Sequence, residues 1–134
     1  MIFEFKKRIF GYDCDVYGHL NNASYLQLLE AARAEALIAM DMSISRMQKL
    51  DLQIFILRFE LDYLKAIDLE DTVTVKSWFH KTNRLKGFWV QQIFNSAGEL
   101  CFEANMIGVF ASGGKAKRLP MEIYEHFLKF VESE

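Results

Sequence analysis

The chain has 134 residues, of which 51% are hydrophobic and 25% are charged, and its formal net charge is −2 at pH 7. This length suits one domain with a single core, expected over residues 1–134. The charge argues against nucleic acid as a partner, because phosphate binding needs a basic surplus. Two cysteines make no disulfide framework, and no secretion signal or membrane-length apolar run is visible. Composition therefore predicts a soluble cytoplasmic protein with no membrane partner.

The first half of the chain reads as a strand followed by two helices. Residues 2–12 mix aromatic and β-branched residues with Lys and Arg, which predicts a strand. After a loop over residues 13–22, apolar residues recur at three- and four-residue steps over residues 23–40, which predicts a long helix. An Asn at the end of the loop can cap it. A shorter helix is expected over residues 43–49.

From Gln53 the apolar period changes to two. The alternating apolar residues are Phe55, Leu57, Phe59, Leu61 and Tyr63. This pattern predicts a strand with one buried face. Three more strands are expected over residues 72–82, 87–95 and 100–111. Turn sequences at 83–86 and 96–98 favour antiparallel hairpins, and Pro120 opens a last helix that ends near Val131.

These elements define an α+β domain, in which a curved antiparallel sheet of about five strands wraps around the long central helix, with a C-terminal helix added. Five residues are expected on the sheet face away from that helix: Trp78, His80, Trp89, Gln91 and Ile93. Such a mixed face is more apolar than a monomer normally exposes. We therefore expect a homo-oligomer built from two-fold pairs.

The loop before the long helix carries the most chemistry. It reads Asp13-Cys14-Asp15-Val16-Tyr17-Gly18-His19-Leu20-Asn21-Asn22. A helix start presents unpaired backbone N–H groups and the positive end of the peptide dipole. Such groups stabilise a carbonyl oxygen that becomes negative, while a nearby carboxylate attacks the carbon or activates water. The arrangement predicts an acyl-transfer site.

Three other interpretations of this loop fail on residue type. A calcium loop needs an oxygen ligand at its fifth place and a bidentate Glu at its twelfth, and these places hold Tyr17 and Ser24. The three histidines and two cysteines have no zinc-ligand spacing. Alternation places Cys14 opposite the two acids, so a buried, inert thiol is expected there. We predict no metal and no cofactor.

The loop and its surroundings resemble the hotdog-fold thioesterases of the 4-hydroxybenzoyl-CoA thioesterase type, in the subgroup with Gly-His-Leu-Asn-Asn. The similarity rests on Asp13-x-Asp15-x-x-Gly18-His19-Leu20-Asn21-Asn22-x-x-Tyr25, on Glu30-Ala31-Ala32-Arg33, and on Lys117-Arg118-Leu119-Pro120. The resemblance implies a hotdog fold and hydrolysis of an acyl-CoA or acyl-carrier-protein thioester. It also suits a homodimer or homotetramer.

The resemblance also assigns roles. Asp15 corresponds to the catalytic carboxylate, as nucleophile or general base, and the backbone N–H of Asn22 corresponds to the group that polarises the thioester carbonyl. Related enzymes carry His where this chain has Asn22. Four residues are candidates for supporting roles: Asp13, His19, Asn21 and Glu30. The acyl chain is expected between helix and sheet, against Tyr25, Leu29, Phe59 and Met106.

Some alternatives stay open at this point. The same fold suits a hydratase or dehydratase of acyl thioesters with His19 as base, or an acyl-binding module without catalysis. A purely structural oligomer is disfavoured by the two loop acids. Glu30 and Arg33 are expected to form a surface ion pair. Some of eight basic residues could hold a nucleotide phosphate: Arg58, Lys65, Lys81, Arg84, Lys86, Lys115, Lys117 and Arg118.

Overall fold

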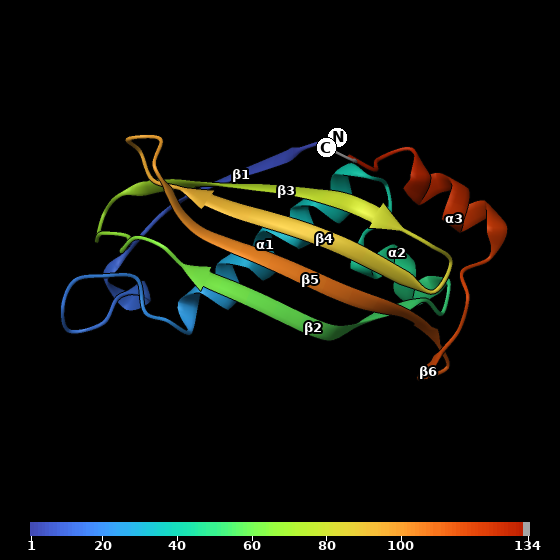
Figure 1. Ribbon diagram of the computed structural model, residues 1–134. Coiled ribbons are helices and arrows are strands. Elements are labelled where there is room, and N and C mark those ends of the chain that lie inside the picture. Colours follow the sequence, from blue (N-terminus) through green and yellow to red (C-terminus); the bar gives the residue numbers. More distant parts are fainter. Residues whose placement is uncertain (133–134) are drawn as a thin grey trace.

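The computed structural model describes residues 1–132, and it consists of one curved antiparallel sheet with a long helix across one face (Figure 1). The strand order is β1-β3-β4-β5-β2, and β6 pairs with β5. The strands are β1 (Phe3–Arg8), β2 (Gln53–Tyr63), β3 (Thr72–Thr82), β4 (Lys86–Phe94), β5 (Leu100–Ser112) and β6 (Lys115–Ala116). The predicted α+β class is therefore confirmed.

The helices begin and end close to the predicted positions. They are α1 (Ser24–Ala39), α2 (Ile44–Lys49) and α3 (Met121–Leu128). The residue before α1 is Ala23, and no side chain caps the helix. The Asn21 side chain instead accepts from the Ala23 N–H at 3.0 Å, so it orders the preceding turn. Among residues 1–132, no helix combines the length and apolar character needed to cross a membrane.

Aromatic packing fixes the N-terminal end of α1 against the sheet. Tyr25 stacks on the fully buried Phe102 of β5, with ring centroids 4.6 Å apart. Tyr63, at the end of β2, meets both rings edge-on at 4.9–5.0 Å. Burying a large apolar side chain stabilises a fold by about 1.5–3 kcal/mol, and such ring pairs add to this. The start of α1 is therefore held beside the end of β2.

The expectation that Trp89, Gln91 and Ile93 face away from the helix is wrong. Their exposed fractions are 3%, 1% and 0%, and Gln91 donates to a backbone carbonyl of α1. The reason is the strand register, which pairs Trp89 with the inward residue Phe79 rather than with Trp78. Side chains alternate along each strand, so Gln91 and Ile93 follow Trp89 inward. The outer face thus loses most of the apolar residues expected on it.

The prediction of one buried face along β2 is correct only for its second half. The pairing with β5 shifts between Ile56 and Arg58, and this β-bulge reverses which side chains face inward. Phe55 and Leu57 are consequently 46% and 57% exposed, whereas Phe59 is mostly buried. A bulge is not visible in an alternation pattern, so the sequence did not reveal it.

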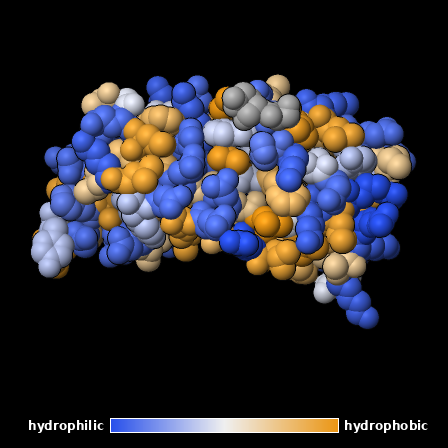
Figure 2. Space-filling view, in the orientation of Figure 1, coloured by the Kyte–Doolittle hydropathy of each residue, from blue (hydrophilic) through white to orange (hydrophobic). Residues whose placement is uncertain are grey.

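The two edges of the sheet differ in character. The exposed side chains of edge strand β1 are charged: Glu4, Lys6 and Arg8. Edge strand β2 exposes Phe55, Ile56 and Leu57 in sequence, and in Figure 2 hydrophobic side chains gather along the lower margin of the molecule, where β2 lies. Charges on an edge strand prevent pairing with another chain, while a long apolar edge invites it. The β2 edge is therefore the better candidate for an interface.

Candidate functional site

The loop before α1 is a short hairpin closed by its own backbone. The Asp15 N–H donates to the His19 carbonyl, and the Asn21 N–H donates to the Asp13 carbonyl, both at 2.9 Å. Gly18 has φ of +76°, a left-handed conformation that glycine adopts without steric cost. These bonds fix residue 15 in the hairpin that leads into α1.

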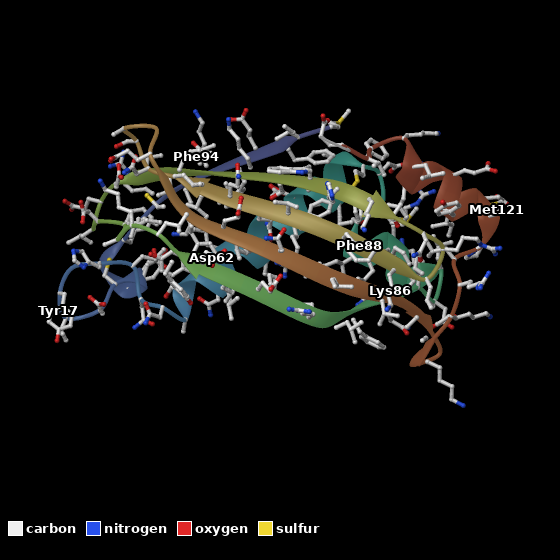
Figure 3. The ribbon with its side chains drawn as sticks, viewed as in Figure 1. Tyr17, Asp62, Lys86, Phe88, Phe94 and Met121 are labelled. Atoms are coloured by element: carbon white, nitrogen blue, oxygen red, sulfur yellow. The ribbon has the colours of Figure 1, made fainter. Side chains whose placement is uncertain are left out.

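The Asp15 carboxylate has one oxygen engaged and one available. Its Oδ1 accepts from the backbone N–H groups of Tyr17 at 2.9 Å and of His19 at 3.3 Å. Within residues 1–132, no hydrogen-bond donor reaches its Oδ2. Figure 3 shows Tyr17 at the tip of the turn, pointing away from the sheet. One oxygen thus shapes the turn, and the other is available for chemistry.

The backbone around Asn22 offers an unused donor. In the described part of the chain its N–H has no acceptor, although its carbonyl accepts from the Tyr63 hydroxyl at 3.1 Å. Helix α1 begins two residues later, so this N–H lies at the positive end of the helix dipole. Its position suits a developing negative charge on a carbonyl oxygen.

Tyr25 links the loop to the core. Burial raises the pKa of its hydroxyl to about 12, with smaller contributions from Cys101, Tyr63 and Asp15. The hydroxyl stays protonated at neutral pH.

The other candidate residues mainly organise the loop. The Asp13 Oδ2 accepts from Lys7 Nζ and from the Phe10 N–H, each at 3.0 Å, so Asp13 ties the loop to β1. The His19 ring lies 3.6 Å from the exposed Asp68 carboxylate. Among the residues described, the His19 bond to the Asp15 carboxylate comes from its backbone N–H and not from its ring.

Cys14 is expected to react slowly with thiol reagents. Burial, followed by the charges of Asp13 and Asp15, raises its pKa, so less of the reactive thiolate exists at neutral pH. We predict slow labelling by iodoacetamide at pH 7.5 that accelerates as the pH rises above about 8.5, the ordinary cysteine pKa. Cys101 is fully buried, so peptide mapping of the native protein reports mainly on Cys14. Rapid labelling at neutral pH, with loss of function in Cys14→Ser, would contradict this.

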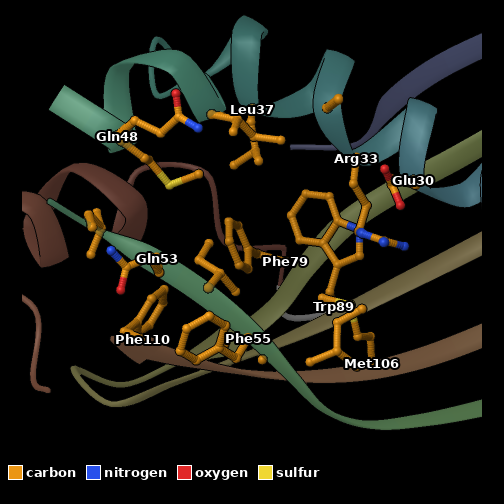
Figure 4. Close-up of a pocket in the computed structure, with 18 residues that line it drawn as sticks. Glu30, Arg33, Leu37, Gln48, Gln53, Phe55, Phe79, Trp89, Met106 and Phe110 are labelled. Atoms are coloured by element: carbon orange, nitrogen blue, oxygen red, sulfur yellow. The ribbon is translucent and has the colours of Figure 1, made fainter. Parts of the chain in front are cut away.

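A cavity of about 380 Å³ lies further along α1, between α1, α2 and the inner face of the sheet (Figure 4). Its lining is mainly apolar and includes Leu37, Phe79 and Phe110. Neither Asp15 nor Asn22 lines it. The first lining residue on α1 is Glu30, about 12 Å along the helix from Asn22 at 1.5 Å per residue.

The expected acyl contacts are only partly at this cavity. Met106 and Glu30 line it. Tyr25 and Leu29 are buried in the adjacent core instead. Phe59 lies beneath Arg33, whose guanidinium carbon is 5.4 Å from the centroid of the Phe59 ring. A contact between these three residues and an acyl chain stays a prediction.

Arg33 is the site residue that sequence reasoning misplaced. The predicted surface ion pair with Glu30 is wrong, since no such pair within 4 Å occurs among residues 1–132. Arg33 points inward, and its Nη1 donates to the Gln91 Oε1 at 3.0 Å. Burial lowers the pKa of Arg33, and the nearby Glu30 charge opposes that shift. Its four-residue spacing from Leu29 and Leu37 was the available signal that it faces inward.

Gln91 holds Arg33 in this position. The Gln91 Nε2 donates to the Leu29 carbonyl at 3.0 Å and to the Ser77 Oγ at 2.9 Å. Both donors of the amide are thereby used on one side, so its oxygen must face Arg33. The guanidinium therefore has a fixed place at the end of the cavity lined by Glu30 and Arg33, which we call the inner end.

The fold is that of the hotdog-type thioesterases. A DHNA-CoA thioesterase from Staphylococcus aureus superposes with a TM-score of 0.85 at 21% identity, covering 96% of this chain and 89% of that one. A second Staphylococcus aureus protein, solved in complex with CoA, gives a TM-score of 0.89 at 14% identity, over 100% of this chain and 88% of that one. At such identities the similarity establishes the fold alone.

The sequence defines the family. The chain belongs to the thioesterase-like superfamily, whose sequence model matches residues 11–131. It is also 33% identical over 86 residues to the long-chain acyl-CoA thioesterase FadM of Escherichia coli, a match that spans 64% of each chain. The relationship to thioesterases is thus confirmed, while membership of the Gly-His-Leu-Asn-Asn subgroup stays a prediction.

Proposed function

We propose that the protein hydrolyses acyl-CoA thioesters to a carboxylic acid and free CoA. The observation that carries this proposal is that, among residues 1–132, one loop contains both a carboxylate oxygen with no donor, Asp15 Oδ2, and an unused backbone N–H, that of Asn22 just before α1. One relative, FadM, is named as an acyl-CoA thioesterase, and this supports CoA rather than a carrier protein as the thiol in the proposed reaction.

In the proposed reaction the thioester oxygen accepts a hydrogen bond from the Asn22 N–H. Asp15 Oδ2 either takes a proton from water, whose oxygen attacks the carbonyl carbon, or attacks that carbon itself to give an anhydride that water then cleaves. The C–S bond breaks with its electron pair on sulfur. A thiol has a pKa of about 8.5, so the thiolate leaves without a strong general acid. A sparse site is therefore sufficient.

We further propose that a second copy completes the site, because the cavity and the loop lie apart within one chain. The apolar β2 edge is the surface for that pairing. If two β2 strands pair antiparallel around a two-fold axis near Arg58, Gln53 of one copy lies opposite Tyr63 of the other. Gln53 lines the cavity, and Tyr63 contacts Asn22. The loop of one copy then meets the cavity of the other.

Basic side chains near the cavity suit the phosphates of CoA. Arg84 lies in the turn between β3 and β4, Lys86 is the first residue of β4, and the Arg84 Nε donates to the Leu119 carbonyl at 2.9 Å. This bond brings the turn next to Lys117 and Arg118, and the adjacent Gly87 lines the cavity. Lys86 lies at the same end of β4 in Figure 3. Guanidinium and ammonium groups bind phosphate through charge-assisted hydrogen bonds.

The test is a panel of acyl-CoA thioesters assayed with a thiol-trapping dye. We expect thiol release from at least one saturated or aromatic acyl-CoA, with the matching carboxylic acid as the second product. An enoyl-CoA included in the panel is expected to lose its thiol and not to gain water across the double bond. Binding of every thioester without thiol release, or hydration of the enoyl compound, would contradict the proposal.

A further inference from the structure

Two hydrogen-bond donors at the cavity remain without an adequate acceptor. Arg33 is mostly buried, bonds only the neutral Gln91 side chain, and has no carboxylate within 4 Å among residues 1–132. The indole N–H of Trp89, a residue only 3% exposed, has no partner in the same part of the chain. The Glu30 charge acts on Arg33 but does not contact it. A mostly buried cation with no carboxylate in contact and a buried N–H without an acceptor are both costly.

The two donors belong to one region of the cavity. Both residues line it, and in Figure 4 Arg33 reaches down from α1 toward the Trp89 ring on the sheet. Trp89 and Gln91, which binds Arg33, are two residues apart on the inner face of β4. Phe59, whose ring lies beneath Arg33, pairs across the strands with Met106, and Met106 pairs in turn with Trp89. Arg33 and Trp89 therefore occupy neighbouring positions on the lining at the inner end.

We infer that this inner end is a carboxylate site, so that the preferred acyl group carries a carboxylate at the end of its chain and Arg33 and Trp89 donate to it. The inference deepens the proposed thioesterase function by naming the substrate class. The apolar walls formed by Leu37, Met47 and Phe110 would hold the methylenes between the thioester and that carboxylate. The Gln91 bond to Arg33 keeps the guanidinium in place before any ligand arrives.

Binding is tested without catalysis, so that failure of the proposed hydrolysis does not affect the result. The probes are S-alkyl-CoA thioethers, which cannot be hydrolysed, in pairs of equal chain length that end in a methyl group or in a carboxylate. Calorimetric titration of the wild-type protein is expected to show tighter binding of the carboxylate member at one or more chain lengths. Equal affinity for both members at every chain length would overturn the inference.

Two variants assign the selectivity to its donors. Arg33→Met is expected to weaken binding of the carboxylate probe by about 10- to 100-fold, the equivalent of one charge-assisted hydrogen-bond partner, and to leave the methyl probe nearly unchanged. Trp89→Phe removes the N–H but keeps a ring against Phe79, so a smaller loss of the same sign is expected. Two substitutions serve as matched controls: Arg46→Met, at an exposed residue of α2, and Trp78→Phe, on the outer face of the sheet. Both variants are expected to keep the selectivity of the wild type.

An acid of a second copy is the other source of a carboxylate for Arg33. In that case Arg33→Met would change the oligomeric state in light scattering and would weaken both probes equally, which contradicts the inference. Loss of carboxylate selectivity with an unchanged oligomeric state and an intact fold by circular dichroism supports it. Should wild-type protein release no thiol from any acyl-CoA yet prefer the carboxylate probe, the proposed hydrolysis fails and the binding site stands.

Discussion

Replacing Asp15 by Asn is expected to slow thioester hydrolysis by about 10²- to 10⁴-fold, the range for a lost general base or nucleophile. The substitution is mild for the fold, because the Asn Oδ1 can still accept from the Tyr17 and His19 N–H groups that shape the turn. The Oδ2 position, however, becomes an NH₂ group that can neither accept a proton nor attack a carbonyl. Steady-state kinetics on the best acyl-CoA of the panel measure the effect, mainly as a fall in kcat.

Asp68→Asn is the matched control for that experiment. It also removes a carboxylate near the loop, but the Asp68 side chain is exposed and, among residues 1–132, its one ion-pair partner is the His19 ring at 3.6 Å. An exposed ion pair contributes little, so most of the hydrolysis should remain. If Asp15→Asn hydrolysed as fast as the wild type, while Asp68→Asn did not, the reacting group would lie on the His19 side of the loop.

Introducing a charge at Leu57 is expected to abolish hydrolysis by separating the two copies. Leu57 is 57% exposed at the bulge of β2, close to the proposed two-fold axis. Leu57→Glu would place two carboxylates beside each other in an interface, a repulsive and desolvated arrangement. Light scattering should then show a monomer, thiol release should fall more than about tenfold, and circular dichroism should show an intact fold. Met121→Glu, an exposed apolar position on α3, serves as the control.

Mixed pairs give a second readout of the shared site. Copies with Asp15→Asn lack the carboxylate, and copies with Ala34→Phe carry a ring in the cavity. Each variant alone should be nearly inactive. Random pairing of the two should restore about a quarter of wild-type activity, because half of the pairs are mixed and each mixed pair keeps one intact site. Activity that never exceeds the sum of the separate variants would show that each chain works alone.

The periodicity of apolar residues predicted most of the secondary structure. The three- and four-residue spacing of α1 and the turn sequences after β3 and β4 predicted elements that the structure places within a few residues. What periodicity missed is pairing register. The β-bulge near Leu57 and the pairing of Trp89 with Phe79 depend on which residue of the neighbouring strand lies opposite, and that is a property of two distant segments.

The candidate site likewise has a part that local sequence predicts and a part that depends on distant segments. The loop residues could be proposed from the sequence because their chemistry is concentrated in one short segment, from Asp13 to Asn22. The cavity was only partly anticipated, through Met106, because its walls come from α1, α2 and four strands, and because Arg33 looked like a solvent-facing helix charge. Only the position of Gln91 on the inner face of β4 shows why an arginine is turned inward there.

The bond from Gln91 to the Leu29 carbonyl has a mechanical consequence. It joins the middle of α1 to the middle of the sheet, so the helix cannot slide lengthwise without leaving a buried amide unpaired. The walls of the cavity, which lies between α1 and the sheet, are thus fixed relative to each other. A cavity with fixed walls would select acyl chains by their length, because it cannot widen to admit longer ones.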